Sequence, residues 1–214
     1  MKEKIESIRK EYIRAVLDEA HTSADPIRQF EIWFDEAMHS DLPEPHAMTL
    51  ATVGEQGRPS ARVVLLRNVQ GGVFSFYSNY LSRKGKQLDL NPFASLSFFW
   101  PELERQIRIE GKIVKLDAHT SSAYFASRPR GSQIGAWASP QSEVIPNREF
   151  LEEHVAQFTA QFEGKAVDRP EHWGGFGLQA DYLEFWQGRE SRLHDRIVYQ
   201  LSNDGIWTRS RLAP

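Results

Sequence analysis

The sequence of 214 residues contains no cysteine. This absence excludes disulfides, thiol nucleophiles, iron–sulfur clusters and cysteine-based zinc sites. No stretch approaches the roughly 18 apolar residues of a membrane-spanning helix, and the opening segment MKEKIESIRKEYIR has no apolar run before its charges resume. We therefore expect a soluble, cytoplasmic protein with neither a signal peptide nor a membrane anchor.

The chain also lacks an excess of positive charge, since 26 Lys and Arg stand against 29 Asp and Glu for a net charge of −3. A general electrostatic attraction to nucleic acid or to an anionic membrane is therefore excluded, and any anion must be bound by a local cluster. Dinucleotide, Walker, GxSxG and HExxH motifs are absent as well. The seven histidines are scattered without the spacing of metal ligands, so no metal is expected.

The apolar residues that are present, 40% of the chain, are enough to fill the core of one large domain. Ile5, Ile8, Tyr12 and Val16 recur at helical spacing, which predicts an amphipathic helix over residues 3–20. A mobile arm is an equally open interpretation of this chain end. Asp25-Pro26 then predicts the N-cap and first turn of a second helix, which ends before the loop 40–46.

From Met48 onward the hydrophobic period is that of strands. MTLATV, SARVVLLR and VFSFY predict an antiparallel meander, and ASLSFFW and RQIRIEGKIVKL extend the β region. A helix is predicted around Leu151–Phe162, followed by the strands GGFGLQA, YLEFWQ, RIVYQLS and IWTRSRL. The fold class is therefore α+β, built on a barrel or a strongly twisted sheet.

Two clusters of cations and hydroxyls suit phosphate groups. Arg83-Lys84 follows Ser82 at the start of a short helical segment, where cations, hydroxyls and unpaired N–H groups are offered together. Tyr124, Arg128 and Ser132 are spaced four apart, so they share one face if the helical turn continues through Pro129. Two such sites in an aromatic-rich chain indicate two phosphorylated aromatic ligands.

The segment LEFWQGRESRLHDR, residues 183–196, resembles the C-terminal signature of the pyridoxamine 5′-phosphate oxidase family. The resemblance continues through RVVLLR, FYSNYLSRKGKQ, LERQIRIEG, YFASRPRGSQIGAWASPQS, WGGFG and RLAP, from about residue 9 to the end. It implies an FMN-binding split β-barrel with peripheral helices and a homodimer with FMN at the subunit interface. The implied reaction oxidises pyridoxine 5′-phosphate or pyridoxamine 5′-phosphate to pyridoxal 5′-phosphate, with dioxygen as acceptor. No nucleic acid or membrane partner is implied.

The resemblance also assigns residues and domains. Residues 1–20 become a helix or mobile arm that can close over the substrate, and residues 21–214 a single FMN-binding split-barrel domain. The implied flavin contacts are Arg62, Val63, Val64, Leu65, Leu66, Tyr77, Ser78, Arg83, Lys84, Gln106, Gln141, Ser142, Trp186 and Arg196. The implied substrate contacts are Arg9, Lys10, Glu11, Tyr12, Arg67, Tyr124, Arg128, Ser132, Arg192, Leu193 and His194, of which Arg192 and His194 are the catalytic pair.

Two positions depart from the family pattern. Arg67 stands where relatives usually have Lys, and Glu44 stands where Asp is common. Two other functions compete with the oxidase: a flavin reductase on the same fold, and a protein that stores or delivers pyridoxal phosphate without turnover. The second cluster, Tyr124, Arg128 and Ser132, has no purpose in the reductase. The complete set of flavin contacts would have no purpose in a storage protein.

Overall fold

A computed structural model describes Tyr12 and residues 15–214 of the chain. Most of the predicted helix over residues 3–20, and with it Arg9, Lys10 and Glu11, lies outside the described residues. Residues 15–18 have no regular secondary structure and lead into the short 3₁₀ helix η1, Glu19–His21. No helix among the described residues is long and apolar enough to cross a membrane.

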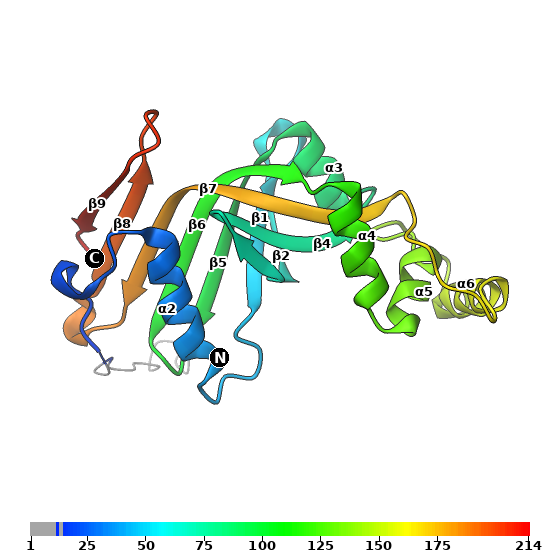
Figure 1. The fold of residues 1–214 in the computed structure, drawn as a ribbon, viewed down its shortest axis with the longest axis horizontal. Helices are drawn as coiled ribbons and strands as arrows, with labels where there is room; N and C mark the ends of the chain where they lie inside the picture. The colour runs from blue at the N-terminus through cyan, green and yellow to red at the C-terminus, as the bar shows by residue number, and fades with distance from the viewer. Residues whose placement is uncertain (1–11, 13–14) are drawn as a thin grey trace, which may run out of the picture. The chain divides into compact units, whose positions relative to one another are not determined.

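The architecture is an antiparallel sheet with helices, which confirms the predicted α+β class at that level (Figure 1). Within the described residues nine strands form one sheet, whose main path runs β2-β1-β5-β6-β7-β4-β3 while β8 pairs with β7 and β9. The strands are β1 Ala47–Val53, β2 Pro59–Leu65, β3 Asn68–Gln70, β4 Val73–Asn79, β5 Phe93–Trp100, β6 Arg105–Lys115, β7 Trp173–Gln187, β8 Asp195–Leu201 and β9 Trp207–Leu212. The helices after η1 are α2 Pro26–Met38, η2 Glu55–Gly57, α3 Arg83–Leu90, α4 Ala118–Ser127, α5 Arg130–Ala138, α6 Arg148–Gln161 and η3 Glu190–Arg192.

The chain divides into two compact units. The first contains the described residues up to Thr49 together with Ser95–Glu110 and Ala180–Pro214. Its core forms on one face of α2, which begins at the predicted cap because the Asp25 side chain accepts from the N–H of Ile27. Trp33 of α2 meets Phe185 of β7 edge-to-face at 5.3 Å between ring centroids. These contacts tie the helix to the sheet of this unit.

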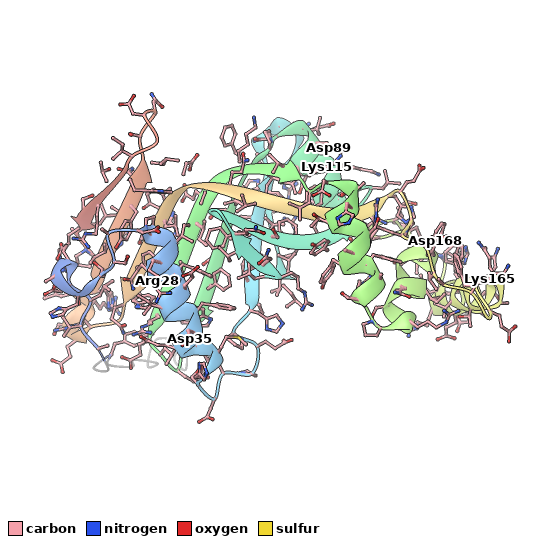
Figure 2. The ribbon with its side chains drawn as sticks, in the orientation of Figure 1. Arg28, Asp35, Asp89, Lys115, Lys165 and Asp168 are labelled. Carbon is pink, nitrogen blue, oxygen red and sulfur yellow. The ribbon has the colours of Figure 1, made fainter. Side chains whose placement is uncertain are left out.

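The second unit contains Leu50–Ala94 and Gly111–Gln179. The Ser82 side chain caps α3 by accepting from the N–H of Gly85, as the sequence predicts for a helix start at Arg83. Lys115 at the end of β6 pairs with Asp89 of α3 at 2.8 Å (Figure 2). The helices α4, α5 and α6 follow β6 in this unit, and a cluster of Phe125, Ile134, Phe162, Val167 and Trp173 is buried among them.

Two sequence predictions about local structure are wrong, and the condition for a shared face of Tyr124, Arg128 and Ser132 is not met. The meander stops after its first hairpin, because β4 pairs with β3 and β7 rather than with β2. GGFGLQA and YLEFWQ form one continuous strand, β7. The helix that carries Tyr124 does not continue through Pro129: Arg128 is extended, with φ −73° and ψ 149°, as the residue before a proline prefers.

Gly85 is the position in α3 where the fold depends on the absence of a side chain. A methyl group there would overlap the backbone carbonyl of Tyr80, whereas the helical Gly135 of α5 has open space at the same position. We expect Gly85→Ala to lower the free energy of unfolding by about 1–3 kcal/mol or more, because backbone must move. Gly135→Ala, the matched control, should be neutral or stabilise by up to about 1 kcal/mol. Urea denaturation measures both, and equal effects of the two substitutions would contradict this account.

Candidate functional site

The second unit contains a cavity of about 340 Å³ that gathers most of the residues predicted from the two phosphate clusters and from the strand RVVLLR. Its described lining holds four cations and no carboxylate. The lining residues are Arg62, Val63, Val64, Leu65, Arg67, Tyr77, Ser78, Lys84, Tyr124, Arg128, Gln141 and Trp173. All but Trp173 are sequence-predicted contacts, brought together here from β2, β4, α3 and α4 and from the segments that follow β2, α4 and α5.

Arg62 of β2 is held by neutral oxygen atoms. Its Nη1 donates to the carbonyl of Leu50 at 3.0 Å and to Thr52 Oγ1 at 2.6 Å. Its Nη2 donates to Ser60 Oγ at 2.7 Å and to Gln87 Oε1 at 3.3 Å. Burial, with a smaller contribution from the neighbouring charge of Arg83, lowers the pKa of Arg62. None of these acceptors is an anion, so they leave the positive charge of the guanidinium uncompensated.

Lys84 reaches the same cavity from the first turn of α3. Its ammonium donates to Ser78 Oγ and to Gln141 Oε1, each at 2.9 Å. Burial lowers the pKa of Lys84, and the charge of Arg62 lowers it further. The two cations therefore repel each other in a partly desolvated space, and a bound anion relieves both penalties.

Aromatic rings form another part of the lining. Tyr77 and Tyr124 stack with ring centroids 3.8 Å apart and an interplanar angle of 14°. Trp173 continues the stack at 5.6 Å from Tyr77. The sequence analysis missed Trp173, although WGGFG is part of the family resemblance. The pairing of its strand with the strand of Tyr77 brings it to the cavity.

Arg128 lies over the Trp173 ring, with its guanidinium carbon 4.5 Å from the centroid. Its Nη1 is buried and has no hydrogen-bond acceptor among the described residues. Arg67 lies 6.0 Å over the ring of Tyr124. A buried guanidinium N–H without an acceptor is costly unless a ligand accepts from it. Arg128 is thus the clearest single indication that an anion belongs here.

Several predicted contacts lie outside this cavity. Ser132 is exposed on α5 and absent from the described lining, because the chain leaves helical geometry at Arg128 and the shared face is lost. Arg83 and Ser142 line a neighbouring cavity of about 410 Å³. Leu66 is buried just after β2, and Gln106 is a half-buried residue of β6 in the first unit.

The C-terminal signature lies in the first unit, where it forms a second cluster. His194 packs 4.6 Å from Trp186, and Tyr12 meets both rings edge-on at 5.9 and 5.8 Å. Gly188 leaves room for Tyr12, because a Cβ there would lie 2.7 Å from its Cγ. The N–H of Arg189 donates to His194 Nδ1 at 3.1 Å, so this nitrogen is an acceptor and the neutral ring carries its proton on Nε2.

Glu184 holds Arg196 in the same unit. Arg196 Nε donates to Glu184 Oε1 at 2.8 Å, while Arg108 Nη1 and Tyr182 Oη donate to Oε2 at 3.2 and 2.9 Å. Burial alone would raise the pKa of Glu184, but the hydrogen bonds from Arg196 and Tyr182 lower it on balance. Burial and the Glu184 hydrogen bond raise the pKa of Tyr182 to about 12.

Arg192, His194 and Arg196 are spaced two residues apart, as on one face of a strand, but they do not form one strand row. Arg192 ends the 3₁₀ turn η3 with a φ of 62°, and β8 begins only at Asp195. Leu193 follows this turn and is 70% exposed. The turn, rather than strand alternation, sets the direction of Arg192.

The fold and the cavity define a class of protein: an antiparallel-sheet protein with a cationic, aromatic-lined cavity suited to phosphorylated aromatic ligands. Comparison with known families is more specific. The profile described as pyridoxamine 5′-phosphate oxidase matches residues 34–162, and the profile described as pyridoxine 5′-phosphate oxidase C-terminal dimerisation region matches residues 173–214. The chain belongs to the pyridoxamine 5′-phosphate oxidase family.

Individual relatives agree over the full length. The chain is 55% identical to the pyridoxine/pyridoxamine 5′-phosphate oxidase of Actinobacillus succinogenes, covering 98% of this chain and 99% of that one. It is 51% identical to the enzyme of the same name from Leptospira interrogans over all of both chains. Among solved structures, PhzG from Burkholderia lata, in complex with tetrahydrophenazine-1-carboxylic acid, is similar with a TM-score of 0.86 and 30% identity, covering 93% of this chain and 98% of that one.

Substitution of Arg128 should change ligand affinity and the free energy of unfolding in opposite directions. We expect Arg128→Met to weaken the binding of a phosphate-bearing ligand about tenfold or more, because a charge-assisted hydrogen bond is lost. The ligand-free protein should become more stable by up to about 1 kcal/mol, because the unpaired buried N–H is removed while a cation–π contact is given up. Urea denaturation and ligand titration give the two values. A destabilised protein with unchanged affinity would contradict the assignment.

Proposed function

We propose that this protein is an FMN-dependent oxidase that converts pyridoxine 5′-phosphate or pyridoxamine 5′-phosphate into pyridoxal 5′-phosphate. The observation that carries the proposal is the cavity of the second unit, where four cations and stacked aromatic rings meet without a carboxylate in the described lining. Family membership and full-length relatives named for this activity support it. Dioxygen is the acceptor and yields hydrogen peroxide, and the amine substrate also releases ammonia.

The cofactor fits the residues present. Lys84 and Arg62 are partly desolvated cations whose acceptors among the described residues are all neutral, and a bound phosphate would stabilise both charges. Ser78 and Gln141 add hydrogen-bonding atoms beside Lys84. When bound, FMN supplies the hydride acceptor for the reaction. The remaining proposed flavin contacts are Val63, Val64, Leu65, Leu66, Tyr77, Arg83, Gln106, Ser142, Trp186 and Arg196.

The substrate phosphate is assigned to the other cations of the cavity. Arg128 offers the buried Nη1–H that has no acceptor among the described residues, and Arg67 and Tyr124 lie beside it. Arg67 can donate two parallel hydrogen bonds where the usual Lys would offer a point charge. Ser132 stays a proposed contact from its place in the family motif.

The vitamer ring is assigned to Arg192 and His194, with Leu193, Tyr12 and the segment Arg9, Lys10 and Glu11 completing the substrate contacts. The neutral His194 tautomer places a donor at Nε2, which can hydrogen-bond the hydroxyl substituent of the pyridine ring. Arg192 keeps the ring in place against the cofactor, so its contribution is positioning of the reacting atoms. Residues 1–20 act as the arm that closes over the substrate in this proposal.

The assembly proposed is a homodimer with FMN at the interface. The profile that matches residues 173–214 is described as a dimerisation region, which supports a dimer. We further propose that residues 21–214 form a single FMN-binding split-barrel domain and that the protein works in the cytoplasm. The solved FMN-binding protein from Nostoc punctiforme, at 18% identity and a TM-score of 0.72, supports the fold.

The proposed function is tested by supplying the purified protein with FMN and either vitamer phosphate in air. We expect pyridoxal 5′-phosphate and hydrogen peroxide to appear in equal amounts, with ammonia from pyridoxamine 5′-phosphate only. Flavin bound without vitamer turnover would favour a flavin reductase. Tight binding of pyridoxal 5′-phosphate without peroxide would favour the storage protein. Either result would reject the oxidase.

The pH dependence of substrate binding tests the role of His194. Burial, assisted by the charge of Arg192, lowers the pKa of His194 from its ordinary value of 6.5, so the ring stays neutral at pH 7. Protonation of Nδ1 would set two donors, this nitrogen and the N–H of Arg189, against each other. We therefore expect kcat/KM to fall with acid only below pH 6.5. His194→Asn should lose this acid limb, and an unchanged limb in the variant would contradict the role.

A further inference from the structure

Gln87, a buried side chain of α3, lies outside the set of residues assigned to either ligand, yet it ends the hydrogen-bond network around Arg62. Its Oε1 accepts from Thr52 Oγ1 at 2.7 Å, from Ser60 Oγ at 2.8 Å and from Arg62 Nη2 at 3.3 Å. Three donors from two strands therefore converge on one amide oxygen. We propose that Gln87 is a positioning residue that fixes Arg62 for binding the phosphate of FMN, an inference that rests on the proposed function.

The direction of each hydrogen bond follows from the chemistry of the groups. A guanidinium can only donate, so the hydroxyls of Thr52 and Ser60 accept from Arg62. Each hydroxyl has one proton, which it then gives to Gln87 Oε1. Two relays thus run from Arg62 to the same oxygen, and each hydrogen bond polarises the next.

These relays orient Arg62 in a specific way. All four terminal N–H groups of its guanidinium have acceptors in the protein: Leu50, Thr52, Ser60 and Gln87. Its Nε–H has no acceptor among the described residues. Arg62 therefore offers a ligand one N–H and a fixed positive charge, and it cannot swing toward another acceptor without breaking the network.

The amide of Gln87 has one orientation in this setting. Reversing it would place an NH₂ group against Nη2 of Arg62, which can only donate, so the oxygen faces the strands. The NH₂ group points toward Gly54, where a Cβ would lie only 2.9 Å from Nε2. The absence of a side chain at Gly54 thus leaves room for the amide. Gln87 also follows Lys84 by three residues, which places both on neighbouring positions of α3.

Because the Gln87 side chain is neutral, it leaves the positive charge of Arg62 uncompensated. A carboxylate at this position would accept the same hydrogen bonds but would neutralise Arg62, as Glu184 does for Arg196 in the other unit. A cation held by neutral oxygens keeps its attraction for an anion. Gln87 therefore fixes the geometry of Arg62 while preserving its charge.

A double-mutant cycle on FMN binding tests this assignment. The apoprotein is titrated with FMN by flavin fluorescence quenching in wild type, Gln87→Met, Arg62→Met and the double variant. We expect Gln87→Met to weaken FMN binding about tenfold, the size of one lost charge-assisted hydrogen bond. In the Arg62→Met background the same substitution should cost less than about twofold, because it acts through Arg62. Gln87→Glu should weaken binding at least as strongly as Gln87→Met.

Gln29→Met is the matched control, since Gln29 is also a buried glutamine, and its Oε1 accepts a backbone N–H in the other unit. Its FMN affinity should stay within twofold of wild type. If Gln87→Met does not fold, Ser60→Ala removes one relay alone and should weaken binding severalfold. Equal losses from Gln87→Met with and without Arg62, or an unchanged affinity in Gln87→Met and Gln87→Glu, would overturn the assignment. Failure of wild type to bind FMN would instead overturn the proposed function on which it rests.

Discussion

Positive charge without a neutralising carboxylate is the constraint on which the second unit depends. Among the described residues, Arg62, Arg67, Lys84 and Arg128 have no ion-pair partner, and neutral oxygens hold the two whose hydrogen bonds are known. Cations elsewhere in the described residues are paired with acids: Lys115 with Asp89 in the same unit, and in the first unit Arg105 with Glu36, Arg196 and Arg108 with Glu184, and Arg211 with Glu19 and Asp195. Burying an unpaired charge is costly, so the arrangement in the second unit is explained by an anion that completes it.

Local structure places these cations around one cavity. Ser82 starts α3 so that Lys84 lies in its first turn, and Gly85 allows that turn to approach the carbonyl of Tyr80. Pro129 ends helical geometry at Arg128, which lies over Trp173 instead of along the helix. The chemistry proposed for the protein therefore depends on a cap, a missing side chain and a helix break as much as on the charged residues themselves.

Local signals in the sequence predicted much of this, because caps, alternation and glycine turns act within a few residues. Asp25-Pro26, Ser82 and the alternation in RQIRIEGKIVKL all predicted the observed elements. Pairing of β4 with β7 could not be predicted, since it joins segments about a hundred residues apart in sequence. Residue spacing indicated Arg128 and the family resemblance implied Arg62, but neither the neutral acceptors of Arg62 nor the buried Nη1 of Arg128 follows from sequence spacing.

The most direct test of the central claim is the stability of the ligand-free protein in phosphate and in chloride at equal ionic strength. If the cations form an anion site, phosphate at about ten times its dissociation constant should raise the free energy of unfolding by about 1.4 kcal/mol. Chloride should only screen charge. The difference between the two salts should shrink in a variant that lacks Arg128. Equal stability in both salts would contradict the claim that the cavity is built around a phosphate.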